Sequence, residues 1–207
     1  MINPLADGFP TAVTVGGAEY EINTDFRTAL TIMEAFEDPG LTWLDKQDIT
    51  LALLYGENLP DDLVEAFDMA VFFLDCGEDH SESQSEEGGN RPERLYSFTH
   101  DARYIYSAIQ MTHGVDLEAV EYMHWWRFCY LFQDLREDCY FQRMIYLRSR
   151  RAQGKLTKEE REEWRRNEAV LLLPDQRDPE AEAANADFMA RYRQAQERRA
   201  TARKSPE

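Results

Sequence analysis

Apolar positions recur at helical spacing along most of the chain, and they are densest between residues 115 and 135. Asp116 precedes this stretch as a candidate N-cap, and Trp125 and Trp126 point to different sides of the predicted helix. We therefore expect one central helix that starts after Asp116, with other helices packed on several of its sides. Its main apolar stripe consists of Leu117, Val120, His124, Phe128, Leu131 and Leu135.

A β-hairpin and three helices are predicted before this stretch. Residues 12–15 and 18–22 alternate or are β-branched, and Gly16 and Gly17 between them form a two-residue turn of the kind that closes hairpins. Asn23-Thr24-Asp25 then offers a helix cap. Helical periodicity covers residues 26–37, 43–55 and about 61–74, and these segments end at Asp38-Pro39-Gly40, at Gly56 and after Leu74.

Three further helices are predicted in the second half, besides the central one. Apolar spacing indicates helices over residues 99–112 and 138–153, the latter ending at Gly154. Thr157 and Glu160 form a capping box that begins a charged helix, which runs to about residue 173 before Pro174. The predicted fold class is mainly α, a helical bundle of about six to seven helices with a small N-terminal β-hairpin.

Composition divides the chain into four segments. Residues 1–76 hold the hairpin and an acidic helical half, and residues 96–174 hold an aromatic-rich helical half. Between them, residues 77–95 are polar and acidic and are expected to form a disordered linker. Residues 175–207 are a basic tail, with six basic residues against one acidic between residues 191 and 204, and we expect it to be disordered or to become helical on binding.

The net charge of −17 lies in the first half of the chain. Residues 1–95 contain 21 Asp and Glu against 4 Lys and Arg, and the rest of the chain is balanced. Because an acidic half repels phosphate backbones, we expect protein partners and no nucleic acid. There is no apolar run of 18 residues and no signal peptide, so we expect a cytoplasmic protein without a membrane segment.

Residues that could carry out catalysis are sparse. His100-Asp101 is similar to the pair in metal-dependent phosphohydrolases, and Glu121 with His124 makes one Glu-x-x-His, but neither has the further ligands that a metal needs. The three cysteines form no Cys-x-x-Cys pair, and no nucleophile elbow or phosphate-binding glycine loop occurs. We expect no enzyme activity, cofactor or metal, and a metal-dependent hydrolase built on these four residues stays a weak alternative.

Two features are candidates for partner binding. The adjacent residues Trp125 and Trp126 point about 100° apart on a helix, so one of them, provisionally Trp125, could face a partner. A basic patch lies in and around residues 138–153, with acids close by in sequence. These acids favour ion pairs within the protein, or with the acidic half of a sister subunit in self-association, over nucleic-acid binding. In the isolated subunit we expect solvated side chains for Arg143, Arg148, Arg150 and Arg151.

Several segments occur in an order typical of a known family. They are Asn3-Pro4-Leu5, Asn23-Thr24-Asp25-Phe26-Arg27, Tyr104-Ile105-Tyr106-Ser107-Ala108, Gly114-Val115-Asp116-Leu117, Tyr122-Met123-His124-Trp125-Trp126-Arg127-Phe128 and Tyr146-Leu147-Arg148-Ser149-Arg150. Over residues 1–174 the chain resembles the bacteriophage gene product fifteen family of siphophage tail proteins, and the His-Trp-Trp segment is the most specific part of the match.

The resemblance implies a function in phage assembly. Genes of this family typically lie between those for the tail tube and the tape measure protein, which is the position of tail assembly chaperones. The implied partners are the tape measure protein and the tail tube protein, in the cytoplasm of the bacterial host, and the implied protein is absent from the mature virion. The resemblance brings no catalytic residues with it.

An acidic decoy that mimics DNA is the alternative from a different class of function. Such a protein would inhibit a nucleic-acid-binding protein and needs carboxylates in rows at phosphate-like spacing. Here many carboxylates fall in the segment 77–95 or on separate helices, so the chaperone is the preferred interpretation.

Overall fold

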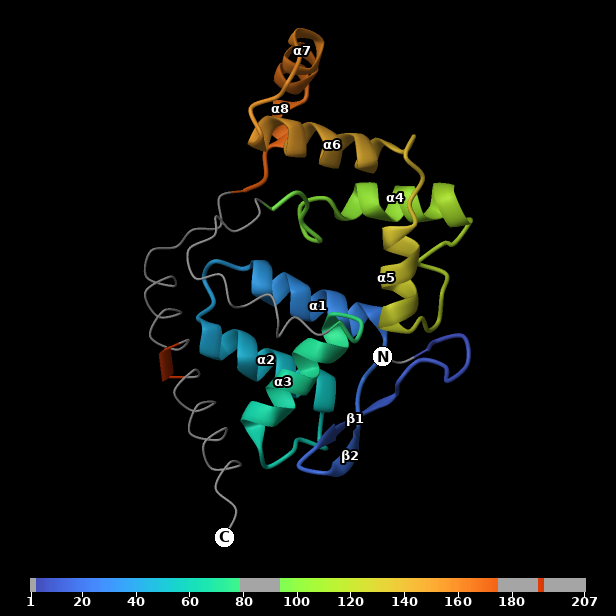
Figure 1. The fold of residues 1–207 in the computed structure, drawn as a ribbon, viewed down its shortest axis with the longest axis vertical. Coiled ribbons are helices and arrows are strands. Elements are labelled where there is room, and N and C mark those ends of the chain that lie inside the picture. The colour runs from blue at the N-terminus through green and yellow to red at the C-terminus, as the bar shows by residue number, and fades with distance from the viewer. Residues whose placement is uncertain (1–2, 79–93, 175–189, 192–207) are drawn as a thin grey trace.

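The structure of the chain, a computed structural model, is mainly helical with an N-terminal hairpin, which confirms the predicted fold class (Figure 1). It describes residues 3–78, 94–174 and 190–191. The predicted segment 77–95 and the tail 175–207 therefore lie mostly outside the described residues. The described elements are β1 Ala12–Val15, β2 Ala18–Glu21, α1 Phe26–Glu37, α2 Trp43–Tyr55, α3 Leu63–Leu74, α4 Ala102–His113, α5 Trp125–Gln133, α6 Tyr140–Ala152, α7 Lys158–Arg166 and α8 Glu168–Leu171.

The hairpin forms as the sequence predicts. Strands β1 and β2 pair antiparallel, with Val15 opposite Ala18, and the turn glycines Gly16 and Gly17 have φ values of 60° and 83°. Two consecutive residues with positive φ are the requirement of the tight turn that matches strand twist. Val13 and Val15 are buried on one face of the hairpin, which packs against α3.

The first three helices also begin and end where local signals predict. The Asp25 carboxylate accepts a hydrogen bond from the backbone N–H of Arg27 at the start of α1. Thr42 forms a capping box at the start of α2, which ends at Gly56, and the Asp62 side chain caps α3. Each cap satisfies backbone N–H groups that the first helical turn leaves without a partner.

The predicted central helix is wrong in its first half. Helix α5 begins at Trp125, and residues 114–124 form an irregular segment. Its backbone pairs with a distant strand-like segment: Phe26 N–H donates to the Met123 carbonyl at 2.9 Å, and Trp125 N–H donates to the Thr24 carbonyl at 2.8 Å. These bonds require an extended backbone at His124, so a tertiary pairing overrides the helical pattern.

Two later helices also differ from the prediction. Helix α4 starts at Ala102, three residues late, because the segment before it binds the Glu37 carboxylate through Ser97 and Phe98. The charged helix predicted to reach residue 173 breaks at Asn167 into α7 and α8. Because α8 ends at Leu171, the carbonyls of Val170 and Leu171 have no partner within the helix and accept hydrogen bonds from a buried arginine of α6.

The two helical halves share one aromatic core. Helix α5 contacts both α1 and α4, so residues from either side of the gap at 79–93 meet on it (Figure 1). The rings of Phe26 and Phe128 stack with centroids 5.2 Å apart, and the indole of Trp126 stacks on Phe73 at 6.2 Å. A smaller cluster at the other end of the molecule contains Met144, Leu147, Trp164 and Leu171.

Candidate partner-binding cleft

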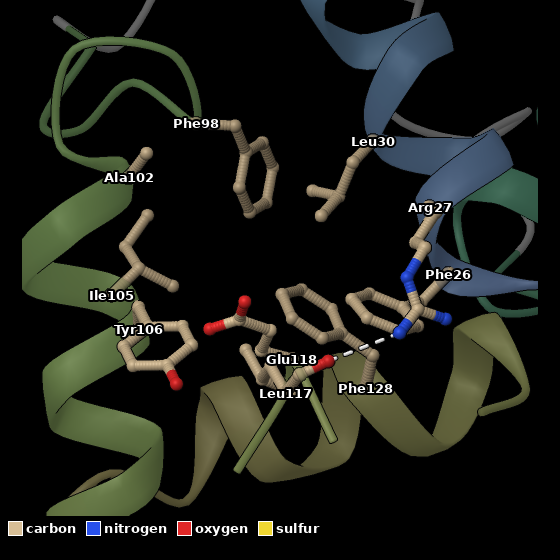
Figure 2. A pocket seen from close by; sticks show the side chains of 10 residues that line it. All are labelled: Phe26, Arg27, Leu30, Phe98, Ala102, Ile105, Tyr106, Leu117, Glu118 and Phe128. Carbon is tan, nitrogen blue, oxygen red and sulfur yellow. Dashed lines mark hydrogen bonds between the residues drawn. The ribbon is translucent and has the colours of Figure 1, made fainter. Parts of the chain in front are cut away.

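An apolar cleft opens between α1, α4 and α5 (Figure 2). It has a volume of about 390 Å³. Helix α4 forms one wall, α1 the facing wall, and α5 with the irregular segment 114–124 the floor. The apolar lining consists of Phe26, Leu30, Phe98, Ala102, Ile105, Leu117 and Phe128.

The walls follow from helical spacing. Phe26 and Leu30 lie one turn apart on α1, and Ala102 and Ile105 lie one turn apart on α4, so each pair faces the same side of its helix. Between the two walls, the rings of Phe98 and Phe128 contact each other with centroids 6.4 Å apart. An apolar hollow that remains open to solvent is a typical place for a partner's apolar side chain.

Arg27 fixes one rim of the cleft. Its guanidinium donates hydrogen bonds to the carbonyls of Leu117, at 3.1 Å, and Val120. It also lies over the Phe26 ring, 4.5 Å from the centroid. These contacts satisfy carbonyls that an irregular segment cannot pair with its own backbone, and they hold the segment 114–124 against α1.

The opposite rim is acidic. The Tyr106 hydroxyl donates a 2.5 Å hydrogen bond to the Asp116 carboxylate, and this bond lowers the pKa of Asp116 below its usual value. Glu118, in the same segment, projects its carboxylate toward the mouth of the cleft (Figure 2). Within the described part of the chain, this carboxylate has no hydrogen-bond or ion-pair partner. The cleft thus combines an apolar interior with one free negative charge.

Trp125 does not reach the surface. Its side chain is 3% exposed, and its indole N–H donates to the Leu74 carbonyl at 2.8 Å. Trp126 is equally buried, and its indole N–H donates to the Phe73 carbonyl at 2.8 Å. The interpretation of Trp125 as an exposed anchor is therefore wrong, because both indoles are buried and bind the last carbonyls of α3.

Arg148 is also internal, contrary to the expectation of a solvated side chain. It is 5% exposed and forms a two-pronged ion pair with the fully buried Asp101, with N···O distances of 2.6 and 2.9 Å. Its remaining donors bind the carbonyls of Leu95, Val170 and Leu171. A buried carboxylate requires such a partner, so Arg148 joins α4, α6 and α8.

The other three arginines of the basic patch contact α7 and α8. The Arg143 guanidinium binds both carboxylate oxygens of Glu163, and Arg150 lies 3.5 Å from the carboxylate of Glu160. Arg151 lies over the Trp164 ring at 4.2 Å and 3.8 Å from Glu168. The pairing that the sequence predicts therefore occurs within the subunit, and binding of these residues to a partner stays a prediction.

Three of the four residues of the hydrolase alternative make separate structural contacts. Asp101 pairs with Arg148, and the His100 ring lies 3.3 Å from the Val170 carbonyl. The His124 ring contacts the Pro10 carbonyl at 2.9 Å and accepts from the Trp126 backbone N–H at 3.1 Å. Glu121 is exposed in the irregular segment 114–124. Among the described residues, no three His, Cys, Asp or Glu side chains are placed to hold a metal ion.

The cleft was not predicted from the sequence. The apolar periods of α1 and α4 identify Leu30 and Ile105 as inward-facing residues, but no local signal places the two helices on opposite walls. Arg27 and Glu118 match no functional motif, and Arg27 reaches the segment 114–124 through a hydrogen bond with Leu117, 90 positions away in the chain. Among the described helices, none has the length and hydrophobicity to cross a lipid bilayer.

Comparison with known proteins identifies the family. Curated proteins and solved structures gave no significant match. The sequence model of one protein family, described as Bacteriophage Gp15 protein, matches residues 5–173. These residues include the hairpin, helices α1 to α8 and the cleft. Because this match spans most of the chain, the protein belongs to the Bacteriophage Gp15 family of phage proteins.

Proposed function

We propose that this protein is a tail assembly chaperone that binds the tape measure protein and assists assembly of the tail tube. It acts in the cytoplasm of the bacterial host by binding, without catalysis, and it is absent from the mature virion. Membership of a phage protein family supports this proposal. The observation that carries it is the open apolar cleft between α1, α4 and α5.

The cleft suits an apolar side chain on a helix of the client. Leu30 and Phe98 are half-buried and Ala102 is exposed, so these residues form the part of the lining that a client can reach. A Leu or Phe side chain that leaves water against them gains about 1.5–3 kcal/mol. The free carboxylate of Glu118 at the mouth favours a Lys or Arg next to that side chain in the client. A long helical client offers many such positions, so several copies of this protein can bind along one client, each at a different segment.

Co-expression with the tape measure protein tests the proposal. We expect soluble tape measure protein to be recovered, bound to this chain, only when the two are produced together. Ala102→Arg places a long charged side chain at the cleft wall and should lower recovery about tenfold, because one apolar anchor is lost. Ser107→Arg, on an exposed position of α4 outside the cleft, is the matched control and should bind like the wild type.

The two parts of this experiment fail in different ways. If the tape measure protein stays insoluble or unbound with the wild-type chain, the chaperone proposal is wrong. If Ala102→Arg and Ser107→Arg both bind like the wild type, the chaperone proposal stands and the client binds elsewhere than the cleft. Far-UV circular dichroism of both variants shows whether α4 is intact.

A further inference from the structure

A separate hollow lies at the opposite end of the molecule, between α6, α7 and α8. Its volume is about 280 Å³. Unlike the apolar cleft, it is lined mainly by arginine side chains around one tryptophan. The lining residues are Arg151, Leu156, Arg161, Trp164, Arg165 and Glu168.

Two of these arginines are available to a ligand. Arg161 and Arg165 lie one turn apart on α7, so their side chains extend over the same face of the helix. Both residues are exposed, and neither guanidinium has a hydrogen-bond or ion-pair partner in the described ranges. By contrast, Arg143 and Arg150 of α6 are paired with Glu163 and Glu160 of α7.

The tryptophan of the hollow differs from the two indoles of α5 in its hydrogen bonding. Trp164 is 6% exposed, and its indole N–H is buried without an acceptor among the described residues. A buried N–H without an acceptor is unfavourable and therefore rare in folded proteins. The indoles of Trp125 and Trp126 each donate to a backbone carbonyl, so Trp164 differs from both in lacking a partner.

We propose that this hollow is a binding site for a side-chain carboxylate of an acidic polypeptide segment. The oxygens of a carboxylate fit the planar N–H pairs of guanidinium groups, and Arg161 and Arg165 present two such groups. The one acid of the lining, Glu168, lies 3.8 Å from Arg151.

The four indole N–H signals of the ¹⁵N-labelled full chain provide a direct test. Trp164→Phe removes and so assigns one signal. We expect titration with a hexaglutamate peptide to shift the Trp164 signal saturably, while the signals of Trp125 and Trp126 stay in place. The double variant Arg161→Gln/Arg165→Gln should weaken binding at least about tenfold, since two charge-assisted contacts are lost.

A matched pair of substitutions separates the site from general charge. Lys158→Gln/Arg166→Gln removes the same two charges from exposed positions of α7 that do not line the hollow, and it should bind the peptide like the wild type. Equal weakening in both double variants, or no saturable shift of the Trp164 signal, overturns the proposal. Tighter binding of inorganic phosphate or of single-stranded DNA than of the peptide overturns the carboxylate assignment and indicates a phosphate site.

Discussion

Individual polar residues hold this fold together at points where the chain is irregular. Arg148 satisfies Asp101 and three carbonyls at once, and Arg27 satisfies two carbonyls of the segment 114–124. His124 does the same at the start of α5, where its ring stacks on Phe9 with centroids 4.8 Å apart. Because each of these side chains is a partner to backbone groups far away in sequence, its loss leaves several buried groups unsatisfied.

Protonation of His124 should destabilise the protein. Burial lowers the pKa of His124 below 6.5, and the hydrogen bond with the Pro10 carbonyl offsets this only in part. The ring nitrogen Nδ1 accepts the Trp126 N–H, a bond that the protonated ring cannot make. As pH falls below about 6.5, the unfolded chain takes up the proton first, so the stability present above this pH is lost as pH falls through the lower folded pKa.

Urea denaturation between pH 7.5 and 5.5 measures this effect. In His124→Asn, the amide oxygen can still cap α5, but the titrating group is gone, so the free energy of unfolding should depend less on pH than in the wild type. At pH 7.5 the variant should be less stable by about 1–3 kcal/mol, because the contacts with Phe9 and Pro10 are lost. Equal pH slopes for the two proteins would show that His124 does not titrate in this window.

At the scale of elements, the junction between α3 and α5 leaves no space for a side chain at Gly77. Gly77 follows α3 with φ at +78°, and a Cβ at this position would lie 2.9 Å from a ring carbon of Trp126. Both the backbone conformation and the space therefore favour glycine. The predicted stop after residue 74 is local, but the contact with the ring depends on α5 lying across the end of α3.

Gly77→Ala should lower the free energy of unfolding by about 2–4 kcal/mol, since it adds a steric overlap to an unfavourable φ. Gly154→Ala is the matched control, because Gly154 also has a positive φ, +67°, but open space around its Cα. It should cost about 1 kcal/mol. Denaturant midpoints of both variants give the comparison, and equal losses would mean that the Trp126 ring yields without cost.

At the scale of the whole molecule, the shared aromatic core makes the two halves depend on each other. Phe73 of α3 packs on Trp126, and Phe26 of α1 packs on Phe128. If the halves are produced separately as residues 1–90 and 91–174, each exposes large apolar surfaces that the other covers in the intact chain.

We therefore expect neither fragment to unfold cooperatively alone, and the intact chain to show one transition. Tryptophan fluorescence and far-UV circular dichroism should give coincident melting curves for the full protein. A cooperative melt of the isolated 91–174 fragment would instead establish it as an independent domain, as the composition-based division at residues 77–95 first indicates.

The sequence alone determined what depends on neighbours within about one helical turn. Gly16-Gly17 closes the hairpin, Asp25 and Asp62 begin helices, Thr157 and Glu160 form a capping box, and apolar periods assign the mainly helical class. Each of these signals acts through backbone groups close by in the chain, so composition and spacing suffice to identify it.

Only the tertiary structure decided the late start of α5, the burial of Arg148 and the position of the cleft. Arg148 meets Asp101 across 47 positions of sequence, and Arg27 meets Leu117 across 90. Local pattern cannot rank such pairings, because the same arginine has nearby acids to choose from and the same segment has a helical period. The fold selects among them by which buried groups must be satisfied together.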